Sequence, residues 1–233
     1  MFYRAVDFFT FSFYIPMEIL GYTSLFILFC IDYLVHYKYI TSNFSLDEKQ
    51  RAHILSTKNS LTMFLVGIYF NYYYFTSKFN ETGFLGILET TDSKPFGKVL
   101  VLYFAAYLVM DIYIGNAEYH SFMNNITGYF HHTVYSVISA VSLMINIYPM
   151  YLLHMVSELP TFLLSVSKLD AGLRDDSLFG AAFFTTRIAY HVLLTFLFRK
   201  HTLFFTVSLL ALGLHSFWFY KWYIKYAGAP ASA

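Results

Sequence analysis

Apolar stretches long enough to cross a membrane recur along almost the whole chain. A helix that spans the hydrocarbon core needs about 20 mostly apolar residues. Such stretches fill most of this sequence, and the polar connections between them are too short to fold as separate domains. The pattern predicts an all-α fold, a polytopic transmembrane helical bundle of six or seven spans around a lipid-accessible cavity. The candidate spans are 12–36, 59–77, 98–118, 127–146, 148–168, 179–198 and 202–224.

The composition agrees with a chain that lies in lipid. Of its 233 residues, 58% are hydrophobic and 12% are charged, about half the charged share of a soluble domain. The 22 tyrosines and 27 phenylalanines exceed what interfacial belts need, so many of them should pack between helices or line a cavity. The net charge of +1 gives no reason to expect a nucleic-acid partner. The single cysteine excludes an internal disulfide framework.

The number of spans depends on the fourth and fifth stretches, which only 147–149 separate. A re-entrant pair or one broken hairpin would fit as well as two spans, which is why a six-span chain is the alternative. With seven spans, eight lysines and arginines fall on one side and six on the other. This difference favours a cytoplasmic C-terminus only slightly.

Ionisable residues lie inside the apolar stretches, at membrane depth, and seven of them are candidates for a functional site. A charge at the centre of a bilayer costs about 2.5–3.5 kcal/mol or more, so such residues usually face the protein interior and take part in function. We therefore predict that one common interior site is bordered by His131 or His132 and by Asp111, His154, Glu158 and Arg187. The seven candidates are Asp111, His131, His132, His154, Glu158, Arg187 and His191.

Two pairs in this set have helical spacing. His154 and Glu158 are four residues apart, as are Arg187 and His191, so each pair should share a helix face. Arg187 keeps its charge and needs an acidic or carbonyl partner, for which Asp111 and Glu158 are the natural acids. An ion-paired network that only holds helices together is the equally reasonable structural interpretation.

The adjacent His131 and His132 project about 100° apart on a helix. One can face the interior while the other contacts a neighbouring helix, which gives one reactive and one supporting histidine. Pro160 leaves the carbonyl of Val156 without its helical partner, so we expect a kink or an opened turn beside Glu158. The ligand-type residues follow no compact spacing, and no metal site is predicted.

The order of these features resembles the TLC domain, a multi-spanning membrane domain shared by ceramide synthases and several lipid-homeostasis proteins. The resemblance covers about residues 50–225, which would leave 1–49 as an N-terminal span with a polar loop and 226–233 as a flexible tail. The matching stretches are Ser56-Thr57, Tyr107-Leu-Val-Met-Asp111, Tyr129-Phe-His-His132, Ser157-Glu158-Leu-Pro-Thr-Phe162, Phe183-Phe184 with Arg187, and Trp218-Phe-Tyr-Lys221-Trp.

Ceramide synthases transfer an acyl group from acyl-CoA to a sphingoid base, and they follow the double histidine with Asp-x-x-Asp. Here Glu158 stands for the second acid, but Met155 occupies the place of the first. The chain is therefore more similar to the short TLC-domain proteins of phospholipid and sphingolipid homeostasis. We expect classical ceramide synthesis to be absent or weak.

The resulting expectation is a membrane protein of lipid metabolism or homeostasis that binds a lipid or an acyl chain. If it is an enzyme, it is an acyltransferase with acyl-CoA as co-substrate and no tightly bound cofactor. The alternatives are a lipid sensor, chaperone or transporter, and a proton-coupled carrier. Catalytic roles are predicted for Asp111, His131, His132 and Glu158, and substrate-binding roles for His154, Arg187 and His191.

The expected partners are membrane lipids or fatty acyl chains, and a homo-oligomer is left open. The chain should be an integral, multi-pass membrane protein. The endoplasmic reticulum or another endomembrane is the favoured compartment, with the plasma membrane as the alternative.

Overall fold

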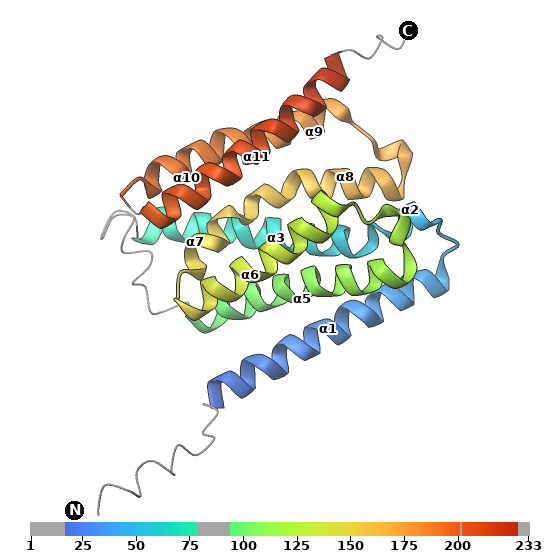
Figure 1. The fold of residues 1–233 in the computed structure, drawn as a ribbon, viewed down its shortest axis with the longest axis horizontal. Helices are drawn as coiled ribbons and strands as arrows, with labels where there is room; N and C mark the ends of the chain where they lie inside the picture. The colour runs from blue at the N-terminus through green and yellow to red at the C-terminus, as the bar shows by residue number, and fades with distance from the viewer. Residues whose placement is uncertain (1–16, 79–93, 201, 228–233) are drawn as a thin grey trace, which may run out of the picture.

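The computed structural model describes residues 17–78, 94–200 and 202–227, and all regular elements within these ranges are helical (Figure 1). The all-α expectation is confirmed for this part of the chain. The elements are α1 (Met17–Asn43), α2 (Glu48–Arg51), α3 (Ile54–Tyr73), η1 (Tyr74–Lys78), α5 (Lys94–Glu118), η2 (His120–Phe122), η3 (Asn125–Phe130), α6 (His131–Met144), α7 (Tyr148–Leu153), η4 (His154–Glu158), α8 (Leu159–Leu169), η5 (Ala171–Leu173), α9 (Asp176–Phe183), η6 (Phe184–Ala189), α10 (Tyr190–Phe198) and α11 (Thr202–Ala227).

Several consecutive elements continue into one another without a break and form longer helical rods. The rods lie side by side and run roughly along one direction, with α1 at one edge and the α10–α11 pair at the opposite edge (Figure 1). The predicted stretches from 59–77 onward each coincide with one rod. The composite rods are 54–78, 125–144, 148–169 and 176–198.

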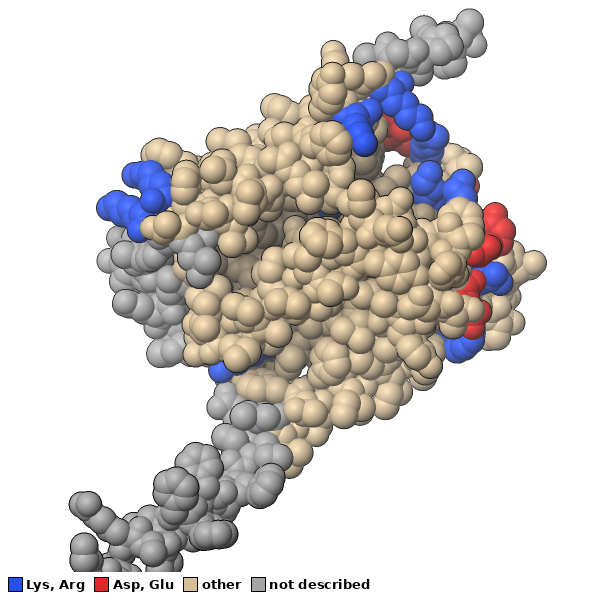
Figure 2. All heavy atoms as spheres, viewed as in Figure 1, with Lys and Arg blue, Asp and Glu red and all other residues tan. Residues whose placement is uncertain are grey.

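Within the described ranges, three helices are long and apolar enough to cross a membrane, namely Leu20–Asn43, Phe96–Glu118 and Asp176–Phe198. Charged side chains gather at the ends of the rods and leave a broad uncharged flank between them (Figure 2). Large apolar side chains such as Leu28, Met144 and Leu210 are exposed on the described surface. This distribution suits a flank that contacts lipid tails.

The first and last predicted segments extend beyond the described residues. Of the stretch 12–36, residues 12–16 lie outside the described ranges, and α1 continues past the expected end to Asn43. In the predicted tail, 226–227 are the last residues of α11, and 228–233 lie outside the description. Residues 79–93, between η1 and α5, also lie outside the described ranges.

The fourth and fifth stretches are separated by a tight turn. Asn146 has a φ of 57° in this turn, a left-handed conformation that asparagine adopts more readily than most residues. Pro149 follows at the start of α7, where its missing N–H costs no helical hydrogen bond. Two antiparallel helical segments therefore connect through very few residues.

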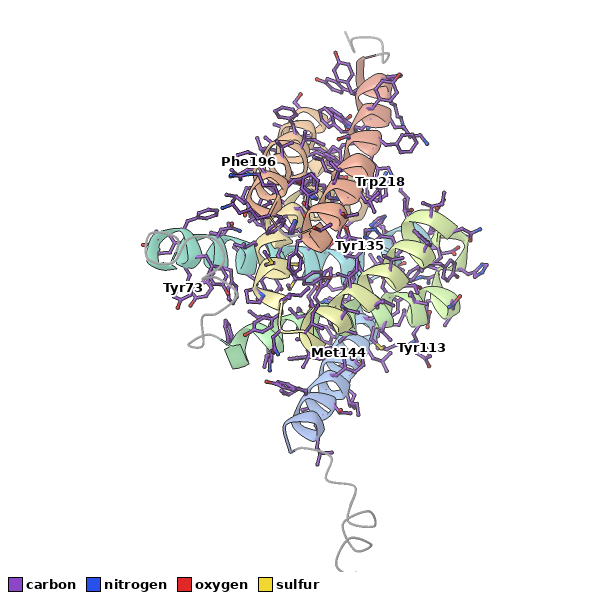
Figure 3. The ribbon with its side chains drawn as sticks, turned by 60° about the vertical axis from the view of Figure 1, so that its left-hand side comes forward. Tyr73, Tyr113, Tyr135, Met144, Phe196 and Trp218 are labelled. Carbon is purple, nitrogen blue, oxygen red and sulfur yellow. The ribbon has the colours of Figure 1, made fainter. Side chains whose placement is uncertain are left out.

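Aromatic residues fill much of the space between the rods, as the composition predicts. Tyr33 and Tyr119 are almost fully buried. Their hydroxyls donate hydrogen bonds to Asn59 Oδ1 at 3.1 Å and to Asp111 Oδ1 at 2.7 Å. Other aromatic rings point outward, such as those of Tyr113 and Phe196, whereas Tyr135 lies between α6 and α11 (Figure 3).

Gly67 allows α3 to approach the turn between α7 and α8 closely. A Cβ atom at this position would lie 2.3 Å from the backbone nitrogen of Val156 and 2.7 Å from the carbonyl carbon of Met155. Both neighbours are backbone atoms, which cannot move aside as a flexible side chain can. The contact therefore depends on glycine.

We expect Gly67→Ala to destabilise the folded protein by roughly 1–3 kcal/mol, because the added methyl group must separate α3 from the turn. The measurement is unfolding of the purified protein in mild detergent. Gly213→Ala is the matched control, because a Cβ at Gly213 meets nothing within 4 Å. Equal stability of Gly67→Ala and the control would contradict the close contact.

Candidate functional site

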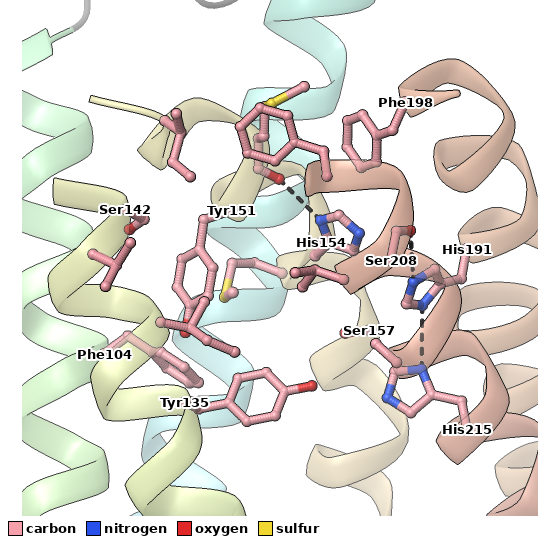
Figure 4. A pocket seen from close by; sticks show the side chains of 18 of the residues that line it. Phe104, Tyr135, Ser142, Tyr151, His154, Ser157, His191, Phe198, Ser208 and His215 are labelled. Carbon is pink, nitrogen blue, oxygen red and sulfur yellow. Dashed lines mark hydrogen bonds between the residues drawn. The ribbon is translucent and has the colours of Figure 1, made fainter. Parts of the chain in front are cut away.

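A cavity of about 250 Å³ lies between α6 on one side and α10 and α11 on the other (Figure 4). Residues of α7, η4 and η6 complete its wall. Five of the predicted site residues border it, which brings together side chains from three rods. These five residues are His131, His154, Glu158, Arg187 and His191.

The cavity has one aromatic and aliphatic wall and one polar wall. Phe104, Tyr135 and Tyr151 lie on the side of α5, α6 and α7, and His191 and His215 lie on the side of α10 and α11 (Figure 4). Such a division fits a ligand with an apolar body and a polar group.

The cavity mouth opens on the flank of the molecule. Val137, Val141 and Val207 border the cavity and are also exposed, so they form part of its rim. Figure 2 shows a hollow in the surface between α11 and α6, and the surface around this hollow is uncharged. The mouth of the cavity therefore lies between helices and away from the charged rod ends.

Arg187 is anchored by groups from the neighbouring rod. Its Nε donates a hydrogen bond to the carbonyl oxygen of Ser157 at 2.8 Å, and one terminal nitrogen donates to Thr161 Oγ1 at 2.6 Å. The guanidinium also lies over the ring of Phe183, at 5.2 Å from its centroid. Arginine has five N–H donors, so donors remain for a ligand in the cavity.

Arg187 belongs to the π-helical turn η6, in the middle of a rod. Turns of this kind occur frequently at functional sites. A second one, η3, directly precedes His131 and His132. The sequence carried no signal for either wide turn.

The acceptor for Arg187 comes from the turn that precedes Pro160. Residues His154–Glu158 form a 3₁₀ turn, and the carbonyl of Val156 accepts from the N–H of Leu159. The expected interruption beside Glu158 is therefore present, but as a tightened 3₁₀ turn and not as an opened one, and the carbonyl of Val156 has a partner. Because Pro160 and the tighter turn interrupt the helical pattern, the carbonyl of Ser157 is available to another rod.

Glu158 borders the cavity beside Arg187, but the two residues form no ion pair within 4.0 Å. Their opposite charges still attract one another across the site. Of the partners that the sequence suggested for Arg187, a carbonyl is the one observed. The suggested pairing with Asp111 is wrong, because Asp111 contacts other residues.

Neither predicted pair with four-residue spacing forms. His154 Nδ1 donates to the carbonyl oxygen of Met150 at 2.9 Å instead of contacting Glu158. The 3₁₀ turn advances by about 120° per residue, so positions four apart do not share a face there. Arg187 and His191 also bind different partners.

His131 and His132 diverge as the helical geometry predicts. His131 borders the cavity, and its ring centroid lies 4.4 Å from that of Tyr135 and 5.9 Å from that of Trp218. No hydrogen bond to another described residue occupies either of its ring nitrogens. His131 is therefore the imidazole with the greatest freedom to contact a ligand.

His132 and Asp111 do not border the cavity. They are buried behind it, where His132 Nδ1 lies 3.2 Å from Asp111 Oδ2. The N–H is not aligned well enough for a hydrogen bond, so the contact is a close electrostatic pair. The predicted shared site thus holds for His131 of the histidine pair, His154, Glu158 and Arg187, and it is wrong for Asp111. Asp111 and His132 form an adjoining pair between α5 and α6.

His215, which the sequence analysis did not include, belongs to the polar wall. Its Nδ1 lies 3.2 Å from His191 Nδ1, and His191 Nε2 lies 3.1 Å from Ser208 Oγ. Ser208 also bonds Thr195 Oγ1 at 2.7 Å. His215 lies in the apolar stretch 202–224, so the criterion that selected the other histidines would also have selected it.

The described residues contain no group of three or more His, Cys, Asp or Glu side chains arranged to hold a metal ion. Comparison of the chain with protein-family models, with curated proteins and with solved structures found no match. The description of the site therefore depends on its geometry alone.

We expect Ser208→Ala to destabilise the protein by about 1–3 kcal/mol, because it leaves buried polar groups of His191 and Thr195 without a partner. Unfolding in detergent measures the effect. Ser216→Ala is the control: Ser216 lies on the same helix, is exposed, and bonds only the carbonyl of Leu212. Its effect should stay within about 0.5 kcal/mol. Similar values for the two variants would show that the network does not contribute.

Proposed function

We propose that this chain is a multi-pass membrane protein of lipid metabolism or homeostasis, and that its cavity binds a lipid or an acyl chain. The proposal treats the seven rods as spans, including those that fall short of the length and hydropathy of the three longest apolar helices. The charged ends and the uncharged flank support this placement (Figure 2). The resemblance to TLC-domain proteins supports the lipid class of the ligand and an endomembrane location.

One observation carries the proposal: Arg187 borders an otherwise largely apolar cavity without a carboxylate within ion-pair distance. A charge without a direct ion pair is costly at membrane depth, and a ligand that accepts hydrogen bonds from Arg187 would lower this cost. Its remaining donors suit a carbonyl, carboxylate or phosphate oxygen. The aromatic and aliphatic wall suits the chain attached to that group.

We expect the protein purified in mild detergent to retain lipid, and Arg187→Gln to retain it about 10- to 100-fold less tightly. This range corresponds to the loss of a charge-assisted hydrogen bond of about 1.5–3 kcal/mol. Native mass spectrometry of the bound lipid provides the measurement. Arg199→Gln is the matched control, because Arg199 is exposed at the end of α10.

Equal retention of lipid by Arg187→Gln and Arg199→Gln would contradict the role of the cavity. Size-exclusion chromatography of each variant separates loss of ligand from loss of fold. Absence of bound lipid from the folded wild type, with no uptake from added lipids, would contradict lipid binding itself.

Acyl transfer is the second candidate, favoured by the unoccupied ring nitrogens of His131 at the cavity. In this reaction His131 accepts the proton from an attacking amine or hydroxyl, which forms a new C–N or C–O bond at the thioester carbonyl of acyl-CoA. The C–S bond breaks, and the thiolate takes the proton from the imidazolium. Arg187 would donate to the carbonyl oxygen as its charge develops, and Glu158 would stabilise the imidazolium.

We expect His131→Ala to lower acyl transfer by about 10²–10⁴-fold, the usual contribution of a general base. Glu158→Gln should lower it too, because the side chain keeps its shape and loses its charge. Purified protein is incubated with acyl-CoA and a panel of sphingoid bases or lysolipids, and mass spectrometry quantifies the product. His120→Ala is the control, since His120 is exposed in η2, away from the cavity.

His132→Ala distinguishes a supporting role from a chemical one, because His132 is buried against Asp111 and does not border the cavity. No turnover by the wild type, together with bound lipid that Arg187→Gln releases, would favour a sensor, chaperone or transporter over an enzyme.

A further inference from the structure

A second pocket, of about 290 Å³, lies at one charged end of the rods, away from the lipid cavity. The C-terminal part of α8, the segment before α9 and the C-terminal part of α11 surround it. Its lining combines basic side chains with aromatic rings. Lys168, Arg174 and Lys225 are the basic residues, and Phe179, Trp222 and Tyr226 are the aromatic ones.

The acidic residues of this pocket are already engaged by other groups. Asp176 accepts two hydrogen bonds from Arg174, at 3.1 and 2.9 Å. Asp175 caps α9 by accepting from the N–H of Leu178 at 2.8 Å. Neither carboxylate forms an ion pair with either of the two lysines that line the pocket.

Lys168 and Lys225 form no ion pair within 4.0 Å with a described residue. Lys168 is also repelled by the positive charges of Lys49, Arg174 and Lys225, against the single attraction of Asp176. A group of cations that the protein itself does not neutralise attracts an anion from outside.

The aromatic side of the pocket is rigidly arranged. The rings of Trp222 and Tyr226 are stacked, with centroids 5.1 Å apart, and Phe179 lies 5.8 Å from Trp222. Trp222 packs directly on Gly180, where any Cβ would clash with the indole. Tryptophan and tyrosine concentrate at the level of lipid headgroups, which agrees with the position of this pocket at the rod ends.

We propose that this pocket binds the headgroup of an anionic phospholipid from the adjacent leaflet. Lys168 and Lys225 would contact the phosphate, and the upper part of the acyl chains would lie along Phe179 and Trp222. This site goes beyond the lipid cavity, and it depends only on the placement of the rod ends at the membrane interface.

Trp222 can report on its own lipid neighbours, because Trp218 is the only other tryptophan. In a Trp218→Phe background, the protein is reconstituted into phosphatidylcholine vesicles that contain brominated phosphatidylserine or brominated phosphatidylcholine. Quenching of Trp222 then compares the local association of the two lipids. We expect the anionic lipid to be preferred.

Replacing both lysines, as Lys168→Gln with Lys225→Gln, should lower this preference by roughly 25-fold. This value assumes about fivefold for each lysine near an anionic headgroup. Arg199→Gln with Lys200→Gln is the matched control, since it removes the same charge at the opposite rod end. Native mass spectrometry of phosphatidylserine bound to variants that keep Trp218 repeats the comparison if the background fails to fold.

An equal loss in the control pair would overturn the proposal, because the preference would then reflect overall charge. Quenching that is the same for both lipids would overturn it as well. Displacement of phosphatidylserine by inorganic phosphate would identify a soluble anion as the ligand and contradict the lipid headgroup. Arg187→Gln should leave the preference unchanged, which separates this pocket from the lipid cavity.

Discussion

Two backbone carbonyl groups near the 3₁₀ turn before Pro160 hold the arrangement of the rods together. Each of them accepts a hydrogen bond from a side chain of another rod. Here the carbonyl of Ser157 accepts from Arg187, and that of Leu153 accepts from Asn71 Nδ2 at 3.0 Å. These two hydrogen bonds join the rod 148–169 to the rod 176–198 and to the rod 54–78. In the hydrocarbon core of a membrane, no water is present to take the place of such bonds.

The same interruption determines where the cavity lies. Asn71 also binds the hydroxyl of Tyr190, so α3, the 3₁₀ turn and α10 meet at one point. Gly67 lets α3 approach the turn closely, while Tyr135 and the histidines fill only part of the space on its other side. The polar wall lies beside this junction and has its own contacts, which join His191 to His215 and to Ser208.

The sequence predicted the helical rods well because hydrocarbon permits few alternatives to a long apolar helix. It also identified five residues of the cavity, since the cost of burying an ionisable group applies wherever the group lies in a span. It could not predict the partners of those residues. The pairing of His154 with Glu158 assumed α-helical spacing, and the 3₁₀ turn changed it. Asp111 and His132 do not border the cavity, because their side chains point toward each other between α5 and α6. The amino-acid composition does not specify this direction.

The rim formed by Val137, Val141 and Val207 faces the flank of the rods. If that flank lies in the bilayer, the cavity equilibrates with lipids in two dimensions, and occupancy follows the mole fraction of a lipid among its neighbours. Total concentration in the aqueous phase then has little influence. Even a weakly held lipid occupies the cavity when it is abundant in the membrane, and dilution with detergent or with an unrelated lipid empties it. The occupancy of such a cavity would therefore follow the proportion of the bound lipid among all membrane lipids.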